Sequence, residues 1–140
     1  MAVDTIEKVI FSLLDNDETV DGLVSSRIYP GVIPQGKAVP AIVYEQAGGD
    51  RSHTFGGTVG YVDSAFDITC WSSTYGGSRT LSDAVRKVLD GHSGTTGTQK
   101  VYVMFLNNEV DIIEEDPTLL GRRRFAKRLS FGMIFKEATS

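Results

Sequence analysis

The sequence has few of the residues on which catalysis, metal binding and disulfide bonding depend. Its 140 residues include one cysteine, Cys70, and two histidines, His53 and His92. A single cysteine excludes a disulfide within the chain and a cysteine-rich metal site. Both histidines fall in predicted loops without a metal-ligand pattern, and neither GxSxG nor GxxxxGK[ST] occurs. We therefore expect no catalytic residues, no metal and no cofactor.

Positive charge and long apolar runs are also scarce. Lysine and arginine total 14 against 18 carboxylates, which gives a net charge of −4. This balance argues against tight binding to DNA phosphates, although it allows a surface past which DNA slides. No apolar run approaches the roughly 20 residues that cross a bilayer, and the N-terminal segment lacks the basic region of a signal peptide. We expect a protein that is made and used in a cytoplasm, with no membrane partner.

The apolar residues that are present predict one α+β domain over residues 1–140. Helical spacing favours a helix from Thr5 to Asp15, a short helical turn after Asp17, and an amphipathic helix that Ser78 caps and Gly91 ends. Between and after the helices, alternation and β-branched residues predict strands at about 41–46, 59–71, 101–106, 110–115 and 122–135. Glycine-rich residues 48–60 are expected at the tip of a long hairpin, and residues 92–100 form a second loop. The order predicts a mostly antiparallel sheet packed with the N-terminal and central helices.

Residues 27–45, RIYPGVIPQGKAVPAIVYE, contain the most distinctive pattern in the chain. Pro30, Pro34 and Pro40 each fix their own φ and favour extended geometry in the preceding residue. The predicted result is a stiff arm without internal hydrogen bonds that runs into an apolar strand. Such an arm must lie against its own domain or against a neighbouring subunit, which favours a role in assembly over catalysis.

Two local features invite a chemical interpretation that the residues support poorly. The loop TYGGSRT (residues 74–80) stands between a strand and a helix, where backbone N–H groups can hold an anion. Without a phosphate-binding motif, a glycine turn with a serine cap explains it better. Cys70 lies on the inward side of a predicted strand, so a packed core thiol is favoured over a nucleophile.

The basic run GRRRFAKR (residues 121–128) resembles a nucleic-acid patch. Alternation divides it, with Arg122, Arg124 and Arg128 on one side of the strand and Arg123 and Lys127 on the other. A hairpin turning over residues 117–121 supplies carboxylate partners. The expected pairs are Asp116 with Arg122, Glu115 with Arg123, Glu114 with Arg124 and Asp111 with Lys127, and Ile113 then faces Phe125. A subunit interface or a surface facing DNA is the alternative.

Taken in order, these segments resemble the tail-completion, or tail-terminator, proteins of long-tailed bacteriophages. The resemblance covers nearly the whole chain from the leading helix onward, although each motif alone is loose. The residues that carry it are Arg27-Ile28-Tyr29, Pro34-Gln35, Pro40 to Tyr44, Asp67 to Trp71, the helix with Ala84, Val85 and Leu89, and Arg128 to Phe131.

The resemblance implies a structural virion protein without a catalytic motif. It implies a ring, usually of six subunits, at the head-proximal end of the tail, where it stops tube growth and meets the head-side connector. Tail tube protein and a head-completion protein would be its partners, and genome DNA would pass through the hole without sequence-specific binding. The residues expected at subunit or partner contacts are Arg27, Tyr29, Pro34, Gln35, Pro40, Arg51, His53, Phe55, Arg122, Arg124 and Arg128.

Three other functions remain open at the level of sequence. The chain could be another neck component, such as a head-closure protein, which differs from a terminator in its binding partners. It could be a monomeric binding module with a closed apolar pocket. An enzyme using Cys70 or a histidine lacks any supporting constellation.

Overall fold

The chain folds into helices and strands in the order that its apolar periodicity predicts. The computed structural model describes residues 6–34, 36–54, 57–96, 99–115 and 123–136. Within them the helices are α1 (Ile6–Asp15), α2 (Glu18–Val24) and α3 (Tyr75–Leu89). The strands are β1 (Ile28–Pro30), β2 (Ala41–Thr54), β3 (Gly57–Ser72), β4 (Gly94–Thr96), β5 (Gln99–Glu115) and β6 (Arg123–Lys136).

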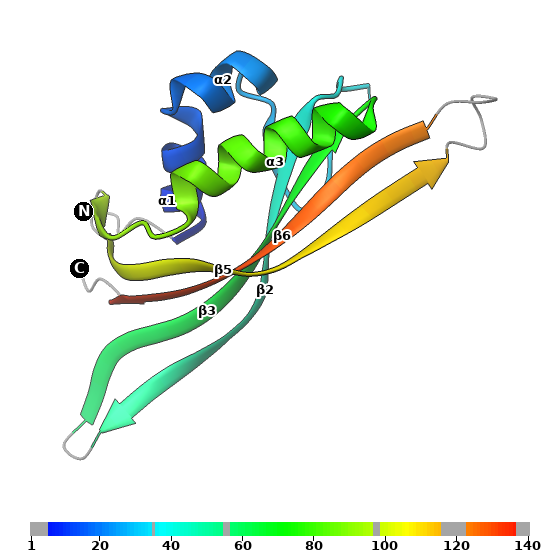
Figure 1. The fold of residues 1–140 in the computed structure, drawn as a ribbon. Coiled ribbons are helices and arrows are strands. Elements are labelled where there is room, and N and C mark those ends of the chain that lie inside the picture. Colours follow the sequence, from blue (N-terminus) through cyan, green and yellow to red (C-terminus); the bar gives the residue numbers. More distant parts are fainter. Residues whose placement is uncertain (1–5, 35, 55–56, 97–98, 116–122, 137–140) are drawn as a thin grey trace.

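All described strands belong to one sheet, in the order β1-β2-β3-β6-β5-β4. Only β1 and β2 run parallel, so the mostly antiparallel α+β prediction is confirmed. The helices cover one face of this sheet, which we call the helix face, and the opposite side is the open face (Figure 1). The β2–β3 hairpin and the outer part of the β5–β6 pair leave the helix-covered region in opposite directions (Figure 1).

The hydrophobic core lies between the helix face and the helices. Phe66, Ile68 and Cys70 alternate along β3 and are all fully buried, as their spacing of two predicts. Phe131 and Leu129 of β6 stand beside them in register. Burying one such large side chain is worth about 1.5–3 kcal/mol. From the helices come Ile10, Leu14, Val20, Val24, Leu81, Val85 and Leu89.

The central helix begins earlier than the sequence predicted. Its N-cap is Thr74, whose hydroxyl accepts a hydrogen bond of 2.9 Å from the backbone N–H of Gly77. The prediction that Ser78 caps this helix was wrong, because Ser78 lies inside it and its hydroxyl donates to the Tyr75 carbonyl. Gly77 is needed in this first turn, since a Cβ there would collide with the Ser72 side chain. The short helical turn predicted after Asp17 is confirmed as α2, and the Asp17 carboxylate caps it by accepting a hydrogen bond of 3.0 Å from the Val20 N–H.

Strand structure is more extensive than the sequence predicted. The segments 101–106 and 110–115 are parts of one long strand, β5, because a register shift between Leu106 and Asn108 lets the pairing continue past Asn107. Gly132 stands opposite Phe105, next to this irregularity, and a Cβ on it would come within 2.8 Å of the Phe105 ring. The predicted loop at 92–100 contains the short strand β4. The ladder of β2 and β3 continues to Thr54 and Gly57.

We predict that Cys70 is inert in the folded protein. Its side chain is fully buried, and burial raises the pKa of its thiol, so the reactive thiolate is suppressed. A maleimide should label the native protein far more slowly than the protein unfolded in urea. Cys70→Ala should lower the free energy of unfolding by about 1–2 kcal/mol through the small cavity it leaves. Rapid labelling of the native protein would contradict this assignment and reopen a chemical role for the thiol.

Candidate assembly surface

Residues 27–40, which we call the arm, fold back onto their own subunit. The Arg27 guanidinium donates a hydrogen bond of 2.8 Å from Nε to the Pro40 carbonyl, and the Ile42 N–H donates to the Arg27 carbonyl at 2.9 Å. These bonds join the two ends of the arm. Its first residues pair with β2 as the edge strand β1, so the arm lies against its own domain. The expectation of no internal hydrogen bonds was wrong, because the Val32 N–H donates to the Pro30 carbonyl at 2.9 Å and the Lys37 N–H to the Pro34 carbonyl at 3.1 Å.

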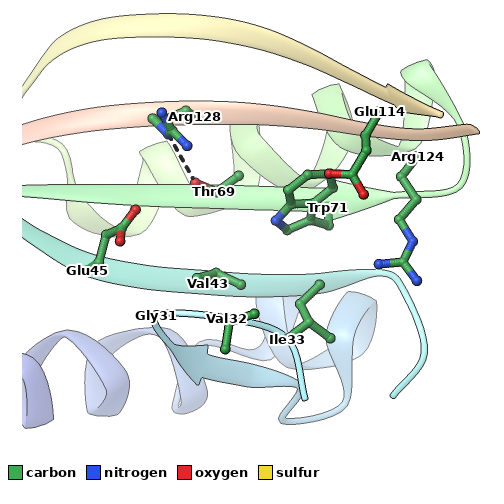
Figure 2. A pocket seen from close by; sticks show the side chains of 10 residues that line it. All are labelled: Gly31, Val32, Ile33, Val43, Glu45, Thr69, Trp71, Glu114, Arg124 and Arg128. Atoms are coloured by element: carbon green, nitrogen blue, oxygen red, sulfur yellow. Dashed lines mark hydrogen bonds between the residues drawn. The ribbon is translucent and has the colours of Figure 1, made fainter. Parts of the chain in front are cut away.

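The arm crosses the open face of the sheet and closes one side of a pocket. Gly31, Val32 and Ile33 line this pocket, whose volume is about 200 Å³, together with residues of four strands (Figure 2). Ile33 is half-buried there, whereas Val32 is 70% exposed. The arm therefore contacts its own sheet on one side and presents an apolar side chain to the solvent on the other. The strand residues that line the pocket are Val43, Glu45, Thr69, Trp71, Glu114, Arg124 and Arg128.

Two arginines of the basic run meet at this pocket. Arg124 and Arg128 lie on the open face, as alternation predicted, and both are half-buried. Arg128 Nε donates to Thr69 Oγ1 at 3.5 Å (Figure 2), and Arg124 stands opposite Glu114 in the ladder. Among the described residues no ion pair to either guanidinium is recorded.

The predicted register of the charged hairpin is confirmed. Glu115 stands opposite Arg123, Glu114 opposite Arg124 and Asp111 opposite Lys127, whereas the Asp116–Arg122 pair lies outside the described residues. The ion pair of Lys127 does not follow the register. Lys127 stands opposite Asp111 in the ladder, but its Nζ lies 3.5 Å from a carboxylate oxygen of Glu109, its diagonal neighbour on β5. Asp111 is instead engaged by Tyr75, whose hydroxyl donates to Asp111 Oδ2 at 3.0 Å.

Tyr75 connects the outer part of the β5–β6 pair to α3. Its ring packs edge-on against Phe125 at a centroid distance of 6.3 Å, in addition to the hydrogen bond to Asp111. We call residues 107–115 with 123–130 the ribbon. Because these contacts join both of its strands to the first turn of the helix, they orient the ribbon relative to the helix layer.

The ribbon exposes apolar side chains on both of its faces. Val110 is 46% exposed and stands in register with Arg128, so it lies on the open face. Ile113 is 61% exposed and stands in register with Phe125, which packs on Tyr75 of α3, so it lies on the side of the helices. Sequence reasoning placed Ile113 opposite Phe125 but gave no signal that either side chain would stay uncovered.

The outer edge of β5 has little protection along the ribbon. Strand β4 covers only Gln99–Val101, and the loop after α3 reaches Met104 and Leu106 through the Gly91 N–H and the Asp90 carboxylate. From Asn107 to Glu115 no described strand pairs with this edge. An unpaired, partly apolar strand edge is a template for association with another chain.

The residues expected at contacts divide between two regions. Arg27, Tyr29, Pro34 and Pro40 belong to the arm, and Arg124 and Arg128 line the pocket that Gly31, Val32 and Ile33 of the arm border. Arg51 and His53 lie on β2 in the projecting hairpin, about 26 Å and about 33 Å from Val43 along the strand at about 3.3 Å per residue. Gln35, Phe55 and Arg122 lie outside the described residues.

No group that could hold a metal ion occurs among the described histidines, cysteines and carboxylates. In the same part of the chain, none of the helices has the length and apolar character needed to span a membrane. Trp71, Thr69 and Glu45 were not predicted as part of the site, although alternation had placed Trp71 and Thr69 on the outward side of their strand.

Comparisons with protein families and with solved structures each give a match. The model of the family described as tail completion protein gp17 matches residues 8–127. No curated protein matches the chain. Among solved structures, a chain from "Virion of native gene transfer agent (GTA) particle" has a similar fold, with a TM-score of 0.65 and 13% identity over 90% of this chain and 91% of that one.

We predict that Lys127 couples to Glu109 more strongly than to Asp111. A double-mutant cycle of Lys127→Met with Glu109→Gln should give a coupling of about 0.3–1 kcal/mol, because the Lys127 side chain is only 18% exposed. The matched cycle with Asp111→Asn should give less than about 0.3 kcal/mol. Both are measured by urea unfolding. A larger coupling to Asp111 would show that the directly opposite pair, rather than the diagonal one, stabilises the hairpin.

Proposed function

Because this chain belongs to the tail completion protein gp17 family, we propose that it forms a ring that ends the tail tube and joins the tail to the head. As a member of that family it is a structural protein of the virion tail. In the proposed role, the ring occupies the head-proximal end of the tube, contacts tube protein on one side and a head-side connector on the other, and lets genome DNA through.

The observation that supports ring formation is the difference between the two ends of the sheet. One end holds β1 and the arm, and the other holds the bare outer edge of β5. Two unlike surfaces on one subunit favour heterologous, head-to-tail contacts, and such contacts close into a ring when the rotation between subunits allows. A two-fold dimer would instead need one surface that is complementary to itself.

The two projections supply contacts above and below such a ring. The β2–β3 hairpin and the ribbon extend in opposite directions from the helix-covered region (Figure 1). In a ring with tube protein on one side and a head-side connector on the other, the hairpin contacts one of these partners and the ribbon contacts the other. The net charge of −4 is consistent with a channel to which DNA does not adhere.

A head-closure component is the second candidate, since it would also form a ring in the neck. The two differ in what happens to the tube. A terminator limits tube length, whereas a head-closure protein acts on the head alone.

We predict that deleting the gene leaves filled capsids without tails, beside tubes of irregular and often excessive length. Purified protein added to an extract of the deletion strain should restore joining to tubes that have not overgrown. Electron microscopy measures both results, and a deletion complemented from a plasmid is the control. Normal tails attached to heads would exclude both neck functions. Tubes of normal length beside unattached heads would favour the head-closure role instead.

A further inference from the structure

The backbone of β5 alternates between residues that bond to β6 and residues that point to the free side of the strand. The Met104 carbonyl accepts from the Gly91 N–H and the Leu106 N–H donates to the Asp90 carboxylate, so these two residues of β5 point to the free side. Both stand opposite odd-numbered residues of β6. Because β6 pairs with β3 without interruption, its odd-numbered residues are equivalent along the whole ladder.

Beyond the register shift, the odd-numbered residues of β5 take the outward position. Glu109, Asp111 and Ile113 also stand opposite odd-numbered residues of β6. Their N–H and C=O groups therefore point to the free side, where no described strand pairs with them. Residues 107–115 span about 26 Å at about 3.3 Å per residue, which is long enough for a further strand.

The side chains along this edge differ between its two sides. On the side of the helices lie the exposed carboxylates of Glu109 and Asp111 with Ile113, which is 61% exposed. On the open face lie Val110, which is 46% exposed, and half-buried Ile112. A strand beside β5 would meet two carboxylates and an isoleucine on one side, and mainly aliphatic side chains on the other.

Strand β6 shows which pattern suits the side of the helices. Arg123, Phe125 and Lys127 stand there in the order cation, apolar, cation, opposite an acidic, an apolar and an acidic residue of β5. Lys127 offsets the charge of Glu109, whereas Asp111 accepts from a neutral hydroxyl and keeps its charge. Because β6 lies one strand farther from the free edge, about 4.8 Å, the carboxylates of β5 are the nearest charges to an added strand.

A second copy of this chain does not match the edge. Two such edges paired antiparallel would place carboxylates opposite one another, such as Asp111 opposite Asp111, which is destabilising. Outside residues 123–128 the sequence has no two cations four positions apart, and β6 is already paired on both sides. On the open face Glu114 lies with Arg124 and Arg128 at the pocket, so charge there favours neither sign.

We propose that the free edge of β5 accepts a strand from a different protein of the virion. That strand carries cation, apolar, cation at alternate positions on one side and aliphatic residues on the other. The inference rests on the proposed function, in which the ribbon contacts tube protein or the head-side connector. Backbone hydrogen bonds supply affinity, and the alternating side chains supply specificity. The contact leaves β4 and the loop after α3, at the same end of the sheet, to the next subunit of the ring.

A synthetic peptide with the sequence of residues 123–130, RRFAKRLS, tests the edge because it has the required pattern. The control peptide has the same composition with its four cations adjacent. Fluorescence anisotropy with the full chain should show binding at least tenfold tighter for the alternating peptide. Ile113→Pro removes an outward N–H but no ladder bond to β6, and should weaken binding at least tenfold. Ile113→Thr keeps the N–H and should weaken binding less than threefold.

A second pair of variants tests the charge component without a change in the backbone. Asp111→Asn removes a carboxylate and keeps an acceptor oxygen for Tyr75, and Glu18→Gln makes the same change of charge on exposed α2. We expect Asp111→Asn to raise the Kd of the alternating peptide by threefold or more, with less effect at 1 M salt because the charges are screened. Glu18→Gln should leave the Kd unchanged.

The possible outcomes separate this contact from the proposed function. Equal binding of the two peptides, equal effects of Asp111→Asn and Glu18→Gln, or binding that a folded Ile113→Pro leaves unchanged would each overturn the contact. Self-association that Ile113→Pro abolishes, measured by analytical ultracentrifugation, would assign the edge to a second copy instead. Tailless capsids in the deletion strain together with failed peptide binding would overturn the contact alone. Peptide binding together with normal attached tails would overturn the neck function and leave the specificity of the edge standing.

Discussion

The pairing of β3 with β6 is the constraint on which the rest of the structure depends. Its ladder runs from Tyr61 opposite Lys136 to Ser72 opposite Phe125, without an interruption. It joins the β2–β3 hairpin to the β5–β6 hairpin, and residues about 60 positions apart must meet before the sheet exists. Closing such a loop is entropically costly, so these contacts need strong compensation from burial. Phe66, Ile68, Leu129 and Phe131 supply it at the centre of the ladder.

One-sided coverage by the helices follows from the same alternation. The odd-numbered residues of β6 from Leu129 to Phe135 face the helices and are buried, so the arginines at even positions are left on the open face. There the arm covers part of the sheet and shields Val43, which is only 5% exposed. The arm thereby completes the packing of its own subunit on one side. Val32 of the arm also borders the pocket but is 70% exposed.

Much of this architecture is predictable from residue spacing, and the failures have physical causes. The helices, the inward position of Cys70 and the register of Glu114 with Arg124 follow from periods of 3.6 and 2 and from charge pairing. The cap at Thr74 was missed because a preference for helix-forming residues disfavours Gly76 and Gly77, whereas the close approach of Ser72 requires a glycine at position 77. Continuous β5 was missed because the polar residues Asn107 and Asn108 suggest a turn, although a register shift accommodates them within a strand. The site was predicted less well, because side chains such as Trp71 join it through tertiary contacts of the arm.

Exposed apolar side chains and an unpaired strand edge are the surface features that are consistent with a structural protein of the virion tail. Within the described residues the core cluster is built from hydrophobic side chains, and it includes the buried thiol of Cys70. The exposed large apolar side chains include Val32 on the arm and Val110 and Ile113 on the ribbon, where charged residues of both signs accompany them. A monomer would keep Ile113 and Val110 in water at a free strand edge, an arrangement that invites aggregation. Tyr75 contacts Phe125 and Asp111 and thereby joins this part of the sheet to the first turn of α3.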